Sequence, residues 1–167
     1  GIAYGEIDGQ KVVVVASRTG GANIRIMDAD TGADITPATF DLSGVAGGLF
    51  VINDVSFSED GKLVVTNMTL DANAAANPFK VYVFEPTGGA PIATYSYNST
   101  SGTAERFGDK ASVFGSWTDG TFRVLAAQQT SQPGSILSIT TTDQGDNWTA
   151  ERIALTADVP TDRNLVG

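Results

Sequence analysis

The sequence contains neither cysteine nor histidine. A chain without cysteine cannot form a disulfide, and it lacks the two side chains from which most structural zinc sites are built. Nucleophilic systems of the Ser-His-Asp and Cys-His kinds are excluded within this chain for the same reason. Any acid–base chemistry would depend on Asp, Glu, Tyr or Lys.

Positive charge and long apolar runs are also scarce. Ten Lys and Arg residues stand against 19 Asp and Glu residues, so the net charge is −9. An acidic surface repels phosphate backbones and anionic lipids, and we therefore expect no nucleic acid partner. No apolar run approaches the roughly 20 residues that span a bilayer, so we expect no membrane insertion.

The length of 167 residues suits one domain, or part of a larger one. Because the chain starts at Gly1 and not at Met, we expect a processed or excised piece from which any targeting segment has been removed. An apolar content of 41% is globular, and a chain of this size can bury roughly 70% of its unfolded surface.

Helical periodicity is nearly absent, and what recurs is a short apolar run followed by a turn. Two turn markers repeat in step. Asp-Gly pairs, which favour hairpins, stand at residues 8, 60 and 119, each ahead of a β-rich run. A second marker places Asp30, Pro86 and Asp143 each two residues before a glycine, so its copies are 56 and 57 residues apart.

This repeat predicts four antiparallel strands in each unit of about 56 residues, which is the pattern of a β-propeller blade. The run Val12–Val15 suits a central strand buried on both faces. The predicted strands are Ile2–Ile7, Lys11–Ser17, Asn23–Met27 and Ile35–Leu42; Leu49–Phe57, Lys62–Asn67, Phe79–Phe84 and Ile92–Tyr97; and Ala111–Trp117, Thr121–Gln128, Ser135–Thr140 and Trp148–Leu155.

The stretch Thr141–Trp148, read as Thr-x-Asp-x-Gly-x-x-Trp, resembles the Asp-box, or BNR repeat, of sialidase-like β-propellers. In that family the motif is a structural hairpin turn. The resemblance assigns this role to Asp143, Gly145 and Trp148, and the repeat extends it to Asp30 and Gly32. Asp accepts backbone N–H bonds within such a turn, and Gly takes the position of positive φ.

Longer strings also resemble a family of secreted, multi-domain bacterial surface propellers of uncharacterised function. These strings are Ser17–Ile26, Asn53–Val55, Phe79–Tyr82, Arg106–Asp109 and Val113-x-Gly115. The resemblance implies an extracellular, bacterial cell-surface location and carries no catalytic assignment.

We therefore expect an all-β domain of three blades, over residues 1–43, 44–98 and 99–157, with 158–167 as a possible first strand of a next blade. Propellers normally have roughly four to eight blades, so three cannot close a ring. We expect the chain either to belong to a larger propeller or to associate with itself, because open blade faces would expose apolar surface.

Binding sites usually lie in long loops on a rigid scaffold. In a propeller, the loops between the second and third strands, and between blades, surround the channel mouth. Here they are Arg18–Ala22, Thr69–Pro78, Gln129–Gly134, Ser43–Gly48 and Asn98–Asp109. The candidate ligand-binding residues at or near them are Arg18, Asn53, Asp54, Arg106 and Asp109.

For each candidate a purely structural role is the favoured reading. The carboxylates would tie loops to backbone amides, the arginines would form surface ion pairs, and Trp117 would pack in the core instead of stacking on a sugar. A weak cation site at Asp28, Asp30 and Asp34 is the alternative to a hairpin turn, and the turn is favoured because Gly32 stands where a calcium loop needs an oxygen ligand.

The leading hypothesis is a non-catalytic binding or structural module, without cofactor or metal, whose ligand is a glycan or a protein. The alternative is a glycan-cleaving enzyme, which needs two carboxyl groups roughly 5–9.5 Å apart, drawn from Asp54, Glu105 and Asp109. Sialidase chemistry would need three arginines around a carboxylate. Arg25 lies in the middle of a predicted strand, and the Arg-Ile-Pro motif of that family is absent.

Overall fold

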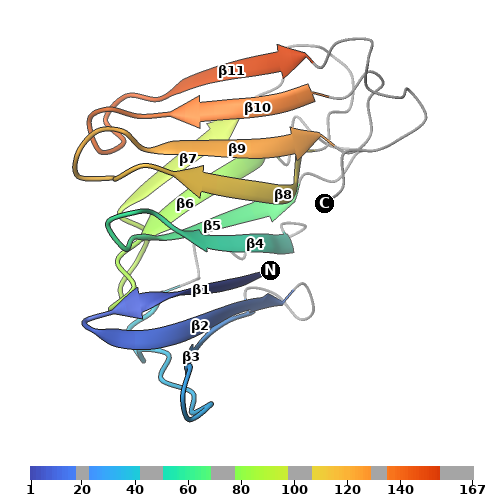
Figure 1. Ribbon diagram of the computed structural model, residues 1–167. Helices are drawn as coiled ribbons and strands as arrows, with labels where there is room; N and C mark the ends of the chain where they lie inside the picture. The colour runs from blue at the N-terminus through green and yellow to red at the C-terminus, as the bar shows by residue number, and fades with distance from the viewer. Residues whose placement is uncertain (18–22, 42–50, 69–77, 98–106, 129–134, 155–167) are drawn as a thin grey trace.

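The computed structural model describes residues 1–17, 23–41, 51–68, 78–97, 107–128 and 135–154. Within these residues the chain is all-β, without a helix, and its strands form three antiparallel sheets (Figure 1). The predicted all-β, antiparallel architecture is confirmed.

Each sheet is a meander in which strands consecutive in sequence are hydrogen-bonded neighbours. The first sheet contains β1 (Ile2–Ile7), β2 (Gln10–Ser17) and β3 (Asn23–Asp28). The second contains β4 (Val51–Phe57), β5 (Leu63–Met68), β6 (Phe79–Phe84) and β7 (Ala93–Tyr97). The third contains β8 (Phe107–Phe114), β9 (Arg123–Gln128), β10 (Ser135–Thr140) and β11 (Thr149–Ala154).

The second sheet lies between the other two and is covered on both faces. Toward the first sheet it contributes Leu63, Val65, Tyr82 and Phe84 to a core shared with Val12, Val14, Ala16, Ile24 and Ile26. Toward the third sheet it contributes Val64, Phe79, Val81 and Val83 to a core shared with Phe107, Trp117, Phe122, Val124, Ala126, Leu137 and Ile139. The continuous apolar runs of β5 and β6 follow from this double burial.

The run Val12–Val15 is different, and the prediction that it is buried on both faces is wrong. Val12 and Val14 are fully buried against the second sheet, whereas Val13 and Val15 are only half-buried. A strand alternates its side chains between two faces, and among the described residues the first sheet has a neighbouring sheet on one face only.

The predicted fourth strand of the first repeat, Ile35–Leu42, is also absent over its described residues. The hydroxyl of Thr36 accepts a hydrogen bond from the Ile26 amide at 2.8 Å, which is the amide that a further strand would pair. Pro37 follows, and proline has no N–H to donate to a ladder. The chain then passes to the second sheet, where the Asp41 amide donates to the Gly89 carbonyl and the Gly89 amide to the Thr39 carbonyl, each at 2.9 Å.

The predicted Asp-Gly turns join the first two strands of each sheet, at the left-hand end of the sheets in Figure 1. Gly9, Gly61 and Gly120 have φ values of 82°, 82° and 69°. Gly115, at φ 73°, ends β8 earlier than predicted, because this backbone conformation is not that of an extended strand. Glycine is required here, since a Cβ atom would press on the carbonyl of Thr121.

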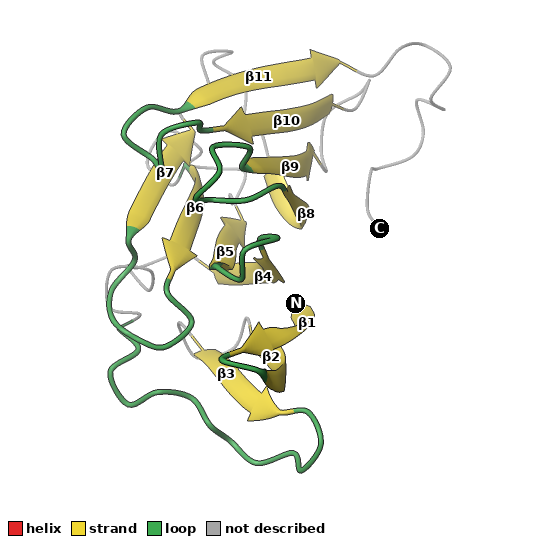
Figure 2. Ribbon diagram, turned by 60° about the vertical axis from the view of Figure 1, so that its left-hand side comes forward, coloured by secondary structure: helices red, strands yellow, loops and turns green. Residues whose placement is uncertain are grey.

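The first strands of the three sheets lie side by side. β4 contacts both β1 and β8, and the later strands of the second and third sheets lie farther from this line, as both ribbon views show (Figures 1 and 2). The first strands therefore form one continuous wall of the molecule.

Candidate functional site

A groove of about 520 Å³ follows the line of first strands. Its lining comes from β1, β4 and β8 alone: Ile2, Ala3, Tyr4, Asp54, Val55, Ser56, Phe57, Lys110, Ala111, Ser112, Val113 and Phe114. The groove therefore brings together residues more than 100 positions apart in the sequence.

Asp54 is the acidic residue of this lining, and backbone amides hold its carboxylate. Oδ1 accepts the amide of Val55 in its own strand at 3.1 Å. Oδ2 accepts the amide of Ala111 in β8, also at 3.1 Å. Asp54 thus connects the second sheet to the third, in agreement with the structural role that the sequence favours for it.

Asn53 makes a second tie between the same two strands. It is buried, and its side-chain amide donates to the carbonyl of Gly108. Both strands are irregular here, with register shifts between Ile52 and Asp54 in β4 and between Phe107 and Ala111 in β8. Bulges of this kind bend a strand and free its backbone groups for such contacts.

Gly108 makes the close approach of the two sheets possible. Its φ is 95°, and a Cβ atom at this position would collide with the carbonyl of Asn67 and the ring of Phe79. Only glycine combines this backbone conformation with this clearance.

The remaining groove residues combine exposed rings with polar groups. Tyr4 is 64% exposed and Phe114 is 49% exposed, on the first and third sheets respectively. Ser56, Ser112 and the exposed Lys110 provide hydroxyl and ammonium groups along the same lining. Such a surface suits a ligand that carries both hydroxyl groups and apolar C–H faces.

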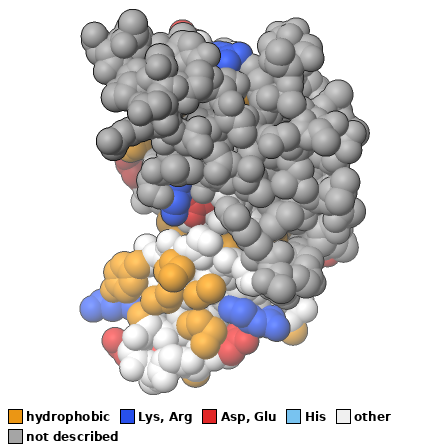
Figure 3. Space-filling model, turned by 90° about the vertical axis from the view of Figure 1, so that its right-hand side faces the viewer, with side chains coloured by type: hydrophobic (Ala, Val, Ile, Leu, Met, Phe, Trp, Pro, Cys, Tyr) orange, Lys and Arg blue, Asp and Glu red, His pale blue; other side chains and the backbone are white. Residues whose placement is uncertain are grey.

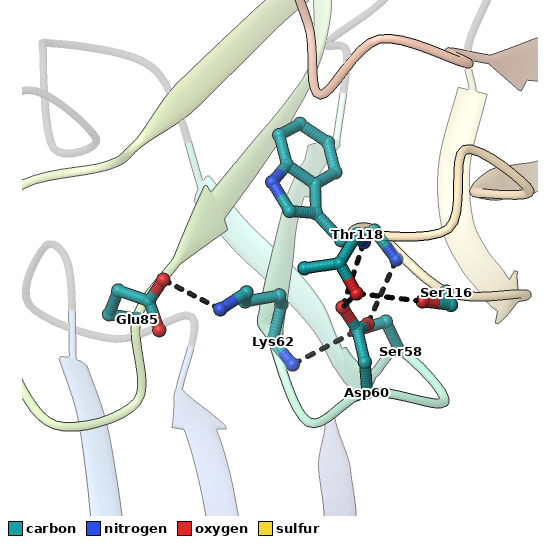
Figure 4. A network of polar contacts seen from close by, with 7 residues as sticks. Ser58, Asp60, Lys62, Glu85, Ser116 and Thr118 are labelled. Atoms are coloured by element: carbon teal, nitrogen blue, oxygen red, sulfur yellow. Dashed lines mark hydrogen bonds and ion pairs between the residues drawn. The ribbon is translucent and has the colours of Figure 1, made fainter.

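At the hairpin end of the sheets, Asp60 accepts more hydrogen bonds from the third sheet than Asp54 does (Figure 4). Its Oδ1 accepts the Ser58 hydroxyl at 2.6 Å and the Trp117 amide at 2.9 Å. Its Oδ2 accepts the amide and the hydroxyl of Thr118 at 2.9 and 3.0 Å. The first turn of the second sheet is thereby bound to the first turn of the third. Close by, Lys62 forms an ion pair with Glu85 at 2.7 Å.

The environment of Asp60 acts on its acidity in two directions. Burial acts to raise the pKa of this carboxyl, but the hydrogen bonds from Ser58, Trp117 and Thr118 outweigh it. The pKa of Asp60 therefore lies well below its usual range, and the carboxylate stays ionised in neutral solution.

Thr141–Trp148 forms a compact turn between β10 and β11. Asp143 Oδ1 accepts the Thr141 hydroxyl and the Asn147 amide, both at 2.9 Å. Hydrogen bonds, first from the Asn147 side chain, lower the pKa of Asp143. Gly145 has a φ of 90°. Trp148 packs its ring 5.9 Å from that of Trp117, which is itself 3% exposed and lies in the core.

In the first sheet Asp28, and not the predicted Asp30, organises the corresponding turn. Asp28 Oδ1 accepts the amides of Asp30 and Thr31 and the Thr31 hydroxyl. These bonds, with one from Gln10 at 2.5 Å, lower the pKa of Asp28 to about 2. Asp34 binds both the amide and the hydroxyl of Thr36. The carboxylate oxygens that Asp28 and Asp34 would offer to a cation are thus already engaged by side chains and backbone amides of the protein.

Several sequence candidates cannot be placed. Arg18, Arg106 and Glu105 lie outside the described residues, as do the residues from 158 onward. For Asp109 the backbone belongs to β8 and the side chain lies outside the described part. The candidate loops also lie outside the described residues, apart from Pro78 and residues 107–109. Arg25, in β3, pairs with Asp34 at 3.6 Å.

Sequence reasoning did not find Tyr4, Lys110, Phe114 or Asp60. The alternation of β1 does contain a signal for Tyr4, since Ala3 and Ile7 pack inward and an aromatic residue between them must point outward. For Asp60, the sequence signal was a turn, and its contacts with the third sheet depend on tertiary packing.

Among the described residues, no group of three acidic side chains is arranged to hold a metal ion. None of them belongs to a helix that would be long and apolar enough to cross a membrane. Within the described groove, Asp54 is the one carboxyl group, and backbone amides occupy both of its oxygens. Compared with known proteins, the chain matches no protein-family model and no curated protein.

Proposed function

We propose that the chain is a three-blade part of a sialidase-like β-propeller and serves as a non-catalytic glycan-binding module of a secreted bacterial surface protein. The observation that carries this proposal is the groove along β1, β4 and β8, in which exposed rings and polar groups alternate around a carboxylate held by backbone amides.

The blade interpretation is supported by the repeated meander sheets and by their adjacent first strands. In a propeller, the first strand of each blade lines the central channel, and the side-by-side placing of β1, β4 and β8 supports this reading. The Asp-box resemblance adds the turn at Thr141–Trp148. The extracellular, bacterial location comes from the longer sequence resemblances alone.

Glycan is the favoured ligand because of the chemistry of the groove. The rings of Tyr4 and Phe114 offer flat apolar surfaces that suit the C–H face of a sugar ring. Ser56, Ser112 and Lys110 supply donors and acceptors for sugar hydroxyl groups. A glycosidase needs a second carboxyl group opposite the first, and the described lining of the groove offers none besides Asp54.

The test is a screen of the fluorescently labelled chain on an immobilised glycan array, followed by titration of the best-bound glycan. Tyr4→Ala and Phe114→Ala should each weaken binding about tenfold, the order expected for loss of an aromatic contact. Ile92→Ala is the matched control, because Ile92 is 45% exposed and lies outside the groove.

Two outcomes would overturn the proposal. Absence of binding to any glycan would remove the ligand class, and binding unaffected by both groove variants would remove the site. A parallel assay with chromogenic glycosides addresses the alternative. Turnover that disappears in Asp54→Asn would replace the binding module with an enzyme.

A further inference from the structure

A hollow of about 340 Å³ lies at the hairpin end of the junction between the first and second sheets, and we call it the turn pocket. Its volume is within the range of roughly 300–1,000 Å³ that is usual for small-molecule pockets. It shares no lining residue with the groove along the first strands. Its lining comes from the first sheet, the segment after β3 and the turn between β6 and β7: Ile7, Asp8, Gln10, Ile26, Ile35, Pro37, Pro86 and Thr87.

The inner wall of the turn pocket is apolar. Ile26 is 1% exposed, and Ile7 and Ile35 pack against the core between the first and second sheets. Pro37 and Pro86 are half-buried and add their ring carbons to the lining. Such a wall suits a flat aromatic group, which buries a large apolar area in a small volume.

At the same end of the junction between the second and third sheets, the chain supplies two aromatic rings of its own. Trp117 is 3% exposed, and its ring lies 5.9 Å from that of Trp148. A Cβ atom at Gly145, in the turn between β10 and β11, would contact both rings. Indole side chains therefore pack beside the last turn of the third sheet.

The second sheet has no aromatic ring at the corresponding positions. Counted from its Asp-Gly pair, Ser58 corresponds to Trp117, and counted from the turn marker at Pro86, Pro91 corresponds to Trp148. Smaller side chains thus stand at the first junction, where the turn pocket is open.

Asp8 differs from its counterpart in the second sheet in a related way. Each precedes the glycine of an Asp-Gly pair, but Asp60 accepts the amides of Trp117 and Thr118 across the second junction. Asp8 is exposed and has no hydrogen bond or ion pair among the described residues. The turn pocket is therefore bordered by a carboxylate without a donor.

The surroundings of Asp8 do not neutralise its charge. Asp28 lies close by, since it accepts the side-chain amide of Gln10, a residue of the pocket lining. The cationic residues at neighbouring positions are each accompanied by an acidic residue: Lys62 by Glu85, Arg25 by Asp34 and, in the strand register, Lys11 by Glu6. Asp8 and Asp28 are left without an opposite charge, so the open side of the pocket favours a cation.

We propose that the turn pocket binds a small molecule that carries a planar aromatic ring and a protonated amine. The ring packs on the isoleucine and proline side chains, as the two tryptophan rings pack at the second junction. The amine donates to the carboxylate of Asp8 at the open side. This site goes beyond the proposed glycan groove, and neither one depends on the other.

Titration of the isotope-labelled whole chain, followed by two-dimensional NMR, tests the site with tryptamine as the probe. The amide signals of Asp8, Gln10 and Thr87 should shift with a dissociation constant of about 1 mM, the order expected for a ligand of this size. Indole-3-propionate, which has the same ring and the opposite charge, should bind at least tenfold more weakly. Equal binding of the two probes contradicts the proposal, as does the absence of shifts at these residues at about 10 mM tryptamine.

Two pairs of variants separate the charge from the space. Asp8→Asn should weaken tryptamine binding about threefold, as expected for an exposed ion pair, and Asp119→Asn, at the same turn position of the third sheet, should leave it unchanged. Thr87→Trp places a ring in the pocket and should weaken binding at least tenfold. Thr94→Trp is its control, at an exposed position outside the pocket. Circular dichroism melting establishes that each variant is folded, and equal affinity of the two tryptophan variants would show that the pocket is not the site.

Adsorption of the probe to a different apolar surface is recognised by the location of the shifts. Hydrophobic side chains gather over the first sheet in the lower part of Figure 3. In this sheet Ile2 is 73% exposed and pairs with Val15 across the strands. Shifts confined to Ile2 and Val15, without changes at Asp8 and Thr87, would indicate adsorption to that surface and overturn the proposal.

Discussion

At the scale of single residues, carboxylates connect parts of the backbone. Asp54 and Asp60 accept backbone amides from the third sheet, and Asp28 and Asp143 accept amides within their own turns. A carboxylate is an acceptor with two oxygens, and each hydrogen bond from an amide satisfies a donor that the bulge or turn leaves outside the ladder. Part of the acidic excess of the sequence therefore has a structural role.

Asp60 provides the sharpest residue-scale prediction. Asp60→Ala removes the acceptor for the Trp117 and Thr118 amides, and should lower the free energy of unfolding by about 1–2 kcal/mol. This cost lies in the lower part of the usual range for the loss of a hydrogen-bond acceptor, because Asp60 remains partly open to solvent. The measurement is urea unfolding, with Asp119→Ala as control at the equivalent turn of the third sheet. Equal losses in the two variants would show that the inter-sheet contact contributes nothing.

The same carboxylates predict an acid limit to stability. Their folded pKa values lie below the ordinary value of 3.8, and that of Asp28 is about 2. Groups with a depressed folded pKa stabilise the fold fully above their unfolded pKa and lose this effect as the pH falls through the folded pKa. The urea concentration at the midpoint of unfolding should stay constant from pH 7 to about 5. It should decline between about pH 4 and 2, because these carboxylates become protonated there. In Asp60→Ala the decline should be smaller, and an unchanged decline would contradict the assignment.

At the scale of elements, turns and glycines decide where strands end and how closely sheets approach. Strands β1, β6 and β10 have the predicted bounds. Ile35–Leu42 is not a strand over its described residues, because Thr36 and Pro37 turn the chain toward the second sheet. The bulges in β4 and β8 bring Asn53 to Gly108. Irregular positions therefore add hydrogen bonds to the apolar contacts between the second and third sheets.

Gly108 and Gly89 are a matched pair for testing the close approach of the second and third sheets. Their φ values are 95° and 92°, so alanine is strained at both, but only at Gly108 would its Cβ meet another sheet. Gly89→Ala should cost about 1 kcal/mol from the backbone alone, and Gly108→Ala should cost about 2 kcal/mol more. Chemical unfolding of the two variants measures the difference. Equal costs would mean that β8 can move away from Asn67 without loss.

At the scale of the whole molecule, the three sheets form a series with two unlike ends. The second sheet is buried on both faces, and hydrogen bonds from Asn53, Asp54 and Asp60 reinforce the apolar core that it shares with the third. Toward the first sheet, the contact is mainly apolar, with the Phe40 and Phe84 rings stacked 4.9 Å apart. The outward faces of the first and third sheets carry the exposed side chains of Ile2, Tyr4, Phe114 and Ile153.

The sequence alone determined the fold class, the repeat, the turns and most strands, because local patterns specify them. Alternating apolar residues, Asp-Gly pairs and the motif around Asp143 act within a few residues of themselves. Such patterns also favoured the core position of Trp117 and the hydrogen bonds of Asp54 to backbone amides.

Only the tertiary structure decided which faces of the strands are covered and which distant residues meet. Val13 and Val15 have the same side chain as Val12 and Val14, but only the latter pair has a neighbouring sheet. Asp60 contacts Thr118, 58 residues away, and the groove joins Tyr4 to Phe114. These relations depend on how one sheet stacks on the next, and no local pattern records the identity of a residue's neighbour in another sheet.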